Sequence, residues 1–131
     1  MRIIITQWGL DSYLDLRNKN VFSRADYFAD IRPAVLLLRD FPTHEKFSQS
    51  GFWSPASGIG GVVRDGFKMK WHNIGPGRVQ LRLAVAMFEG RAFLCDAYVK
   101  SDPKLDKRMM TKLEARLDVI RLDRHIERGE L

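Results

Sequence analysis

Two strand-like segments separated by the dipeptide Glu89-Gly90 constrain the fold more than any other feature of this sequence. In residues 78–88, apolar residues alternate with polar or small ones, which is the pattern of a strand with one buried face. Residues 92–100 are mostly apolar, which is typical of a central strand. Because a short turn ending in glycine favours a hairpin, the sequence predicts that these segments pair antiparallel.

A third strand is predicted at residues 66–72. Aromatic and aliphatic residues alternate there with Lys68, Lys70 and His72, so the two lysines and the histidine are expected on one face. The turn Gly75-Pro76-Gly77 would join this strand to the next. The second half of the chain is therefore predicted to hold a three-stranded antiparallel sheet.

Strand and helix signals surround this sheet. Three consecutive isoleucines predict a strand at residues 2–6, and a short helix is expected at residues 7–17. Residues 23–26 have the form of a capping box, followed by a helix that Pro33 either kinks or splits. Residues 41–61 read as turns and loop with at most one short strand. A long last helix is predicted from Asp102, a good N-cap, to a stop at Gly129.

These elements predict one α+β domain spanning residues 1–131. The expected order is an N-terminal strand, two helices, the three-stranded antiparallel sheet and a long C-terminal helix, with the helices against one face of the sheet. A length of 131 residues suits one domain. No apolar run approaches the ~20 residues that a membrane span needs, and no signal peptide is recognisable, so a cytoplasmic protein without membrane contact is expected.

The formal net charge is +6, and the excess of lysine and arginine over aspartate and glutamate lies almost entirely in residues 66–131. A basic half of a chain indicates an anionic partner such as nucleic acid or an acidic protein, although a solubilising charge is an equally simple explanation. On the predicted strands, Arg78 and Arg82 share a face, and Lys100 and Lys104 lie where the last strand enters the final helix. The predicted RNA-binding set is Lys68, Arg78, Lys100 and Lys104.

The same basic surface has the groups needed to cleave RNA without a metal ion. The ribose 2′-hydroxyl must lose a proton, the phosphorane needs positive charge around it, and the 5′-oxygen must gain a proton. His72 is the one histidine near the basic strands, so it is the candidate acid or base. Lys70 and Arg82 complete the predicted catalytic set. A solvated polar face without activity remains the competing interpretation.

Three aromatic residues lie on the same strands. Phe67, Trp71 and Tyr98 could stack on bases if they were exposed, but a place in the core is the simpler expectation. Asp96 and Tyr98 could also orient a base or donate a proton, and for Asp96 an ordinary polar strand position explains the residue equally well.

No cofactor and no metal ion is expected. His44, His72 and His125 lie far apart without ligand spacing. The glycines form no phosphate-binding or dinucleotide fingerprint. Cys95 is a single cysteine, which excludes an internal disulfide and a multi-cysteine zinc site, and its place within a strand is typical of a small buried residue.

Three segments are similar to the RelE/ParE toxin superfamily, especially its HigB-like, phage-associated branch. They are the arginine-bearing run at residues 78–82, the strand at residues 91–100 that ends in Tyr-Val-Lys, and the lysine-containing turn at residues 101–104. The resemblance in element order covers nearly the whole chain. The catalytic tyrosine or histidine that the family often has at its C-terminus has no counterpart.

This resemblance implies the toxin of a type II toxin–antitoxin system that cleaves mRNA, often on the ribosome. It also implies a RelE-like fold and a cognate antitoxin, encoded nearby, that silences the toxin. Two other hypotheses stay open from the sequence: a non-catalytic nucleic-acid-binding module, and a relative that inhibits a topoisomerase.

Overall fold

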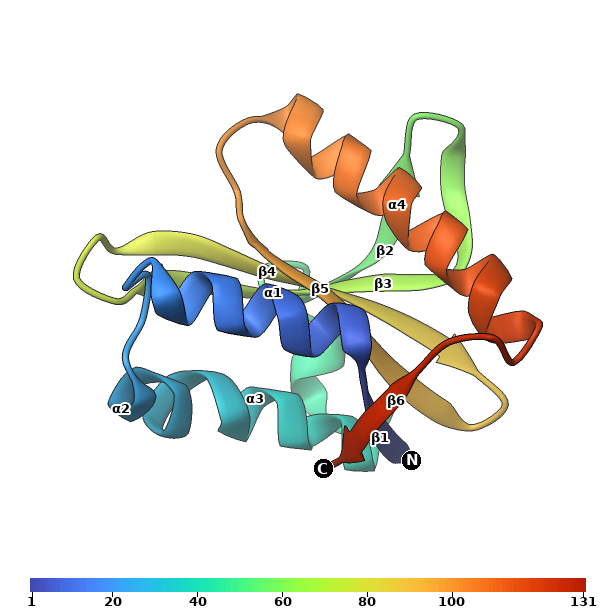
Figure 1. The fold of residues 1–131 in the computed structure, drawn as a ribbon, viewed down its shortest axis with the longest axis horizontal. Helices are drawn as coiled ribbons and strands as arrows, with labels where there is room; N and C mark the ends of the chain where they lie inside the picture. Colours follow the sequence, from blue (N-terminus) through green and yellow to red (C-terminus); the bar gives the residue numbers. More distant parts are fainter.

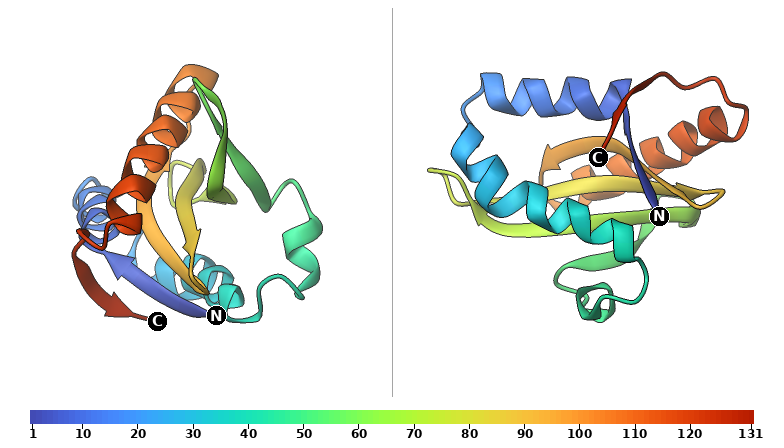
Figure 2. Two further views of the ribbon diagram at one scale, coloured as in Figure 1. Left: turned by 90° about the vertical axis from the view of Figure 1, so that its right-hand side faces the viewer. Right: turned by 90° about the horizontal axis from the view of Figure 1, so that it is seen from below.

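The computed structural model describes residues 1–131 and contains a twisted six-stranded sheet with helices on both faces (Figures 1 and 2). The strands are β1 (Arg2–Thr6), β2 (Trp53–Gly58), β3 (Gly61–Ile74), β4 (Val79–Phe88), β5 (Arg91–Val99) and β6 (Glu127–Glu130). Their order across the sheet is β2-β3-β4-β5-β1-β6. Strands β2 to β5 are antiparallel to their neighbours, β1 runs parallel to β5, and β6 is antiparallel to β1. The structure is α+β, but the predicted three-stranded antiparallel sheet of a RelE-like fold is wrong.

The sheet has six strands instead of the predicted three because the additional strands are not recognisable from local sequence patterns. The pairing of β1 with β5 joins residues some ninety positions apart, and local alternation carries no information about such a partner. Strand β2 contains Pro55 and Gly58, which are typical of turns, and its pairing with β3 is irregular between Pro55 and Ser57. Strand β6 is short and entirely exposed, so it has no buried face to produce an alternating pattern.

The helical segments occupy both sides of the sheet, which corrects the prediction that helices cover one face. They are α1 (Gln7–Asn18), α2 (Arg24–Asp26), the π-helical turn η1 (Tyr27–Ile31), α3 (Arg32–Leu36), the 3-10 turns η2 (Leu37–Asp40) and η3 (Glu45–Ser48), and α4 (Pro103–Arg121). Ser23 and Asp26 form the predicted capping box. Helical residues run without a gap from Arg24 to Asp40, and Pro33 lies in the first turn of α3, directly after the π-helical turn η1. Pro33 thus interrupts the regular α-helix, as predicted, but does not separate it into two helices.

The last helix ends earlier than predicted. Asp102 caps α4 by accepting a hydrogen bond from the backbone N–H of Leu105 at 2.7 Å, as the sequence suggests. The helix stops at Arg121 instead of running to Gly129, and Asp123 adopts a left-handed φ of 55°. The chain then turns back along β1 as β6, which places the two ends of the chain side by side (Figure 1).

Helix α1 packs against the second half of β5, which β1 leaves unpaired, because β1 pairs with β5 only as far as Leu94. The hydroxyl of Thr6 donates to the carbonyl of Leu94 at 2.7 Å, and the backbone N–H of Ala97 donates to the hydroxyl of Ser12 at 2.9 Å. A Cβ on Gly9 would lie 2.4 Å from the Leu94 carbonyl oxygen, so this close approach requires glycine.

Two hydrophobic clusters fill the two sides of the sheet. One joins the sheet to α1, η1 and α3 and includes Trp71, Leu81 and Leu83. The other lies under α4 and includes Met110 and Leu113. No helix of this structure is both long and apolar enough to cross a lipid bilayer. The face covered by α4 also carries the polar residues that make up the candidate site.

Candidate functional site

A row of polar side chains crosses three neighbouring strands on the face that carries α4. Lys70 of β3 lies opposite Arg82 of β4, and Arg82 lies opposite Tyr98 of β5. Strand alternation adds Lys68 and His72 from β3 to the same face. Asp106 of α4 reaches this row, where it accepts a hydrogen bond of 2.6 Å from the Tyr98 hydroxyl. We call Lys68, Lys70, His72, Arg82 and Lys100, together with Tyr98 and Asp106, the basic cluster.

Asp106 neutralises one lysine of the cluster. Its carboxylate forms a charge-assisted hydrogen bond with Lys68, and both side chains are largely buried. Burial raises the pKa of Asp106, but the hydrogen bonds from Lys68 and Tyr98 and the charges of Lys68 and Lys100 outweigh it, so this pKa lies below its usual value. Lys68 is therefore held inside the protein and offers less charge to a ligand than the sequence suggests.

Arg82 is the unusual member of the cluster. It is 5% exposed, and no carboxylate lies within ion-pair distance of it. Its Nη1 donates to the carbonyls of Leu81 at 3.1 Å and Trp71 at 3.3 Å. The buried Nε has no hydrogen-bond partner. A buried guanidinium with an unused donor is costly unless an anion completes it.

Lys70 is likewise free of carboxylates. Its amino group donates to the backbone carbonyl of Ser50 at 2.7 Å. Burial lowers the pKa of Lys70, and the neighbouring charges of Lys68, Arg82 and Lys100 lower it further against the opposing effect of Asp106. Lys70 is thus a lysine whose charge the surrounding protein disfavours.

His72 is exposed and fixed at both ring nitrogens. Its Nδ1 lies 2.5 Å from Oε1 of Gln80, and its Nε2 lies 2.8 Å from the carbonyl oxygen of Gly51. His72 and Lys70 line a depression of about 370 Å³ at the free edge of β3, bordered also by Lys46 and Asp30. A substrate that reached Lys70 would therefore contact His72.

The remaining residues of the predicted set are more dispersed. Lys100 is exposed, and its charge acts on both Lys70 and Asp106. Arg78 and Lys104 are exposed, and no hydrogen bond or ion pair joins their side chains to the cluster. The structure brings together Lys68, Lys70, His72 and Arg82, with Lys100 beside them, and leaves Arg78 and Lys104 at the periphery.

The aromatic residues near the cluster belong to the interior. Trp71 and Tyr98 are each 7% exposed. Phe67 stacks on Trp53 with ring centroids 5.0 Å apart. Trp71 and Tyr98 are therefore too buried to stack on a base, and one ring face of Phe67 is covered by Trp53.

Other polar groups of the sheet and its neighbours have internal partners. Asp96 pairs with Arg116 at 3.3 Å. Cys95 is buried, as predicted, and burial together with the neighbouring charge of Asp96 raises its pKa, so the thiol stays protonated. Neither residue takes part in the basic cluster.

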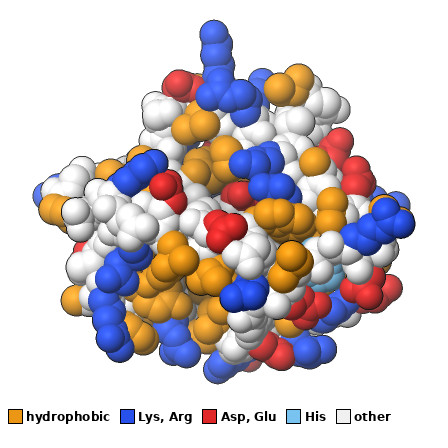
Figure 3. Space-filling model, in the orientation of Figure 1, with side chains coloured by type: hydrophobic (Ala, Val, Ile, Leu, Met, Phe, Trp, Pro, Cys, Tyr) orange, Lys and Arg blue, Asp and Glu red, His pale blue; other side chains and the backbone are white.

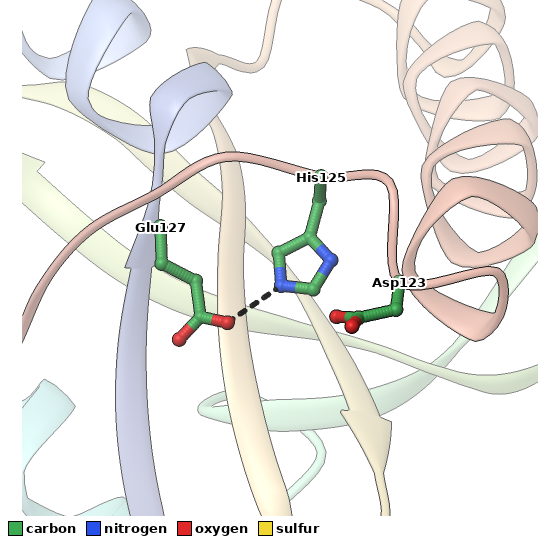
Figure 4. A group of neighbouring side chains, drawn as sticks. All are labelled: Asp123, His125 and Glu127. Carbon is green, nitrogen blue, oxygen red and sulfur yellow. Dashed lines mark hydrogen bonds and ion pairs between the residues drawn. The ribbon is translucent and has the colours of Figure 1, made fainter.

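A second polar group follows α4. Figure 4 shows Asp123, His125 and Glu127 pointing toward one another, with potential ligand atoms within 4.8 Å. Nε2 of His125 lies 3.0 Å from Glu127, and Arg91 approaches the same carboxylate at 3.8 Å. We assign this group to the contacts that hold the end of the chain against the sheet, because the guanidinium of Arg91, at the start of β5, already lies beside Glu127. The spacing of the three histidines does not reveal this group, because His125 lies beside two carboxylates, Asp123 and Glu127, and not beside another histidine.

Asp106 is the residue of the cluster that the sequence did not point to. It follows the N-cap of α4 by four residues, and its position over β5 depends on the direction in which α4 crosses the sheet. Comparison with known proteins found no family model and no curated protein that matches this chain.

Proposed function

We propose that the basic cluster binds the sugar–phosphate backbone of RNA and cleaves it without a metal ion. The observation that carries this proposal is Arg82, a buried guanidinium with an unpartnered Nε and no carboxylate, opposite a lysine that also lacks one. Such an arrangement costs stability in the free protein, and a phosphate group would offset that cost. Arginine suits phosphate because its planar donors match two phosphate oxygens at once.

The catalytic roles follow from the charges of the cluster. Lys70, whose pKa is lowered, takes the proton of the ribose 2′-hydroxyl when it is in its neutral form. The 2′-oxygen then bonds to phosphorus while Arg82 and Lys100 stabilise the charge of the phosphorane. The bond from phosphorus to the 5′-oxygen breaks, and His72 donates the proton that this oxygen needs. The products are a 2′,3′-cyclic phosphate and a free 5′-hydroxyl.

A cleavage assay tests this proposal. The purified chain is incubated with a labelled single-stranded RNA in the presence of a chelator, and the products are separated and tested for a cyclic phosphate end. Arg82→Gln and Lys70→Gln are expected to abolish cleavage. Arg128→Gln is the matched control, because this exposed arginine of β6 lies outside the cluster. Cleavage that persists in both cluster variants would remove the proposed catalytic site.

One observation favours binding without cleavage as a second candidate. Both ring nitrogens of His72 are already within hydrogen-bond distance of protein atoms, so the histidine needs to exchange a partner before it can donate to a leaving group. Under this alternative, the wild-type chain binds RNA in a salt-dependent manner and yields no products.

The cellular role in this proposal comes from the resemblance in residues 78–104. We propose a cytoplasmic toxin that acts on mRNA, on the ribosome or free of it, and that an acidic antitoxin silences by covering the basic cluster. Expression of the wild-type chain is then expected to stop growth, and Arg82→Gln is expected to relieve this effect while the protein stays folded.

A further inference from the structure

A cavity lies on the other side of the sheet from the basic cluster. It has a volume of about 180 Å³, is partly open to solvent, and is bordered by α1, the η1–α3 segment, strands β1, β3, β4 and β5 and the C-terminal Leu131. Gly9, Leu10 and Tyr13 line it from α1, and Tyr27 lines it from η1. Figure 3 shows hydrophobic side chains gathered at the surface of this region, at the lower left of the view. The cavity thus lies near an apolar part of the surface.

The lining of the cavity is apolar almost throughout. Thirteen of its fourteen lining residues are hydrophobic, and the other is Gly9. A water molecule in a cavity needs two to four polar partners, which this lining does not supply. Apolar cavities of about 150 Å³ stay dry and hold a molecule of benzene. The size of this cavity therefore suits one aromatic ring with a small substituent.

Aromatic side chains form one wall of the cavity. Tyr13 lies edge-on to Tyr27 with ring centroids 5.2 Å apart, and it is tilted against Phe22 at 5.6 Å. Rings at these distances and angles interact favourably with one another, and an additional ring can extend the cluster. The wall favours an aromatic ligand over a saturated one of equal size.

The polar atoms nearest the cavity are the hydroxyls of Tyr13 and Tyr27, which favour a neutral ligand. The Tyr13 hydroxyl accepts a hydrogen bond of 2.9 Å from Arg17. Burial raises the pKa of Tyr27, with a further contribution from Tyr13 and against the effect of Arg32, so its hydroxyl stays neutral. Arg17 and Arg32 reach these hydroxyls but do not line the cavity, so a carboxylate held among the lining side chains would lose its hydration without forming an ion pair there.

We propose that this cavity is a binding site for a neutral, single-ring aromatic compound. The site goes beyond the proposed action on RNA and does not depend on it. Trp71 and Leu81 line the cavity, whereas their neighbours Lys70 and Arg82 project to the opposite face. The same two strands thus separate two sites, one apolar and one basic.

Toluene is the probe for this proposal, and benzoate of similar size is the charged comparison. Each is titrated into the isotope-labelled chain, and NMR spectra report which residues shift, while a thermal melt reports stability. Toluene is expected to shift the signals of residues that line the cavity and to raise the melting temperature by about 2 °C or more. Benzoate is expected to bind at least about tenfold more weakly.

Two substitutions on α1 locate the binding. Leu10→Phe places a larger side chain in the cavity and is expected to weaken toluene binding by more than about tenfold. Leu14→Phe makes the same change at a side chain that is 46% exposed and outside the cavity, so binding is expected to stay unchanged. Ala97→Leu fills the cavity from β5 and gives a second test if Leu10→Phe does not fold.

Three results would overturn the proposal. They are a wild-type spectrum in which toluene shifts no cavity residue, equal binding by wild type and by both filled variants, or equal binding of toluene and benzoate. Each would mark the cavity as a packing defect. None of them depends on whether the chain binds or cleaves RNA.

Discussion

Lys70 and Arg82 lie directly opposite each other on adjacent strands, and neither forms an ion pair with a carboxylate. The nearby carboxylate of Asp106 is engaged by Lys68 and Tyr98. Two like charges facing each other across a strand pair oppose folding. This unneutralised pair on a partly buried face is what supports the proposal that the basic cluster binds phosphate.

The first prediction concerns the stability of the free protein. Lys70→Gln is expected to raise the free energy of unfolding by about 0.5 kcal/mol, because it removes one of the two facing charges. Denaturant unfolding at low salt measures the change, and the gain shrinks as salt is added. Arg128→Gln removes an exposed charge outside the cluster and is expected to leave stability unchanged. A loss of stability in Lys70→Gln would show that its charge is already compensated.

The pH dependence of this effect has a defined sign. The pKa of Lys70 lies below 10.5, its ordinary value, so between the two values the unfolded chain binds more protons than the folded one. The free energy of unfolding of the wild type is therefore expected to rise relative to that of Lys70→Gln as pH increases toward 10.5. Unfolding curves of both proteins at several alkaline pH values measure this difference. A difference that stays constant with pH would contradict the lowered pKa.

The second prediction concerns Asp106. Asp106→Asn is expected to lower the free energy of unfolding by about 3 kcal/mol at neutral pH, because it leaves Lys68 as an unpaired, largely buried charge. The pKa of Asp106 is depressed, so this stabilisation is present above the ordinary value of 3.8 and is lost as pH falls through the lower pKa of the folded state. Acid unfolding of wild type and variant measures it.

Glu114→Gln is the matched control for Asp106→Asn. Glu114 is an exposed acidic residue on the same helix without an ion pair, so its loss is expected to change stability by less than about 0.5 kcal/mol. If Asp106→Asn were as mild as this control, the ion pair with Lys68 would not be a stabilising contact.

The third prediction concerns the contact of α1 with β5. Gly9→Ala is expected to cost about 1–3 kcal/mol, because the new Cβ would lie 2.4 Å from the Leu94 carbonyl oxygen and α1 must move away. Gly51→Ala is the comparison, since a Cβ added at Gly51 would have no heavy atom within 4 Å beyond its chain neighbours. Thermal unfolding of the two variants measures the difference, and equal melting temperatures would show that α1 is not held tightly.

Local patterns in the sequence predicted the strands around the site but not the whole sheet. The alternation of Lys68, Lys70 and His72 with apolar residues placed them on one face of β3, and the turn at Glu89-Gly90 joined β4 to β5. The parallel partner of β5, the irregular strand β2 and the polar strand β6 depend on contacts between distant segments, which periodicity does not encode.

The composition of the candidate site was predictable to a similar extent. The proximity of residues on neighbouring strands, such as Lys70 and Arg82, can be predicted from the pairing of those strands. The engagement of Lys68 by Asp106 depends on how α4 crosses the sheet, and the isolation of Arg78 depends on its left-handed turn, with φ of 50°. Both are matters of tertiary geometry.

The salt dependence of RNA binding tests most directly whether the basic cluster holds phosphate. The logarithm of the association constant for a single-stranded RNA is measured against the logarithm of salt concentration for wild type, Arg82→Gln and Arg128→Gln. Loss of one phosphate contact is expected to make the slope for Arg82→Gln shallower by about 0.7, with the Arg128→Gln slope equal to that of wild type. Equal slopes for all three proteins would contradict phosphate binding by the cluster.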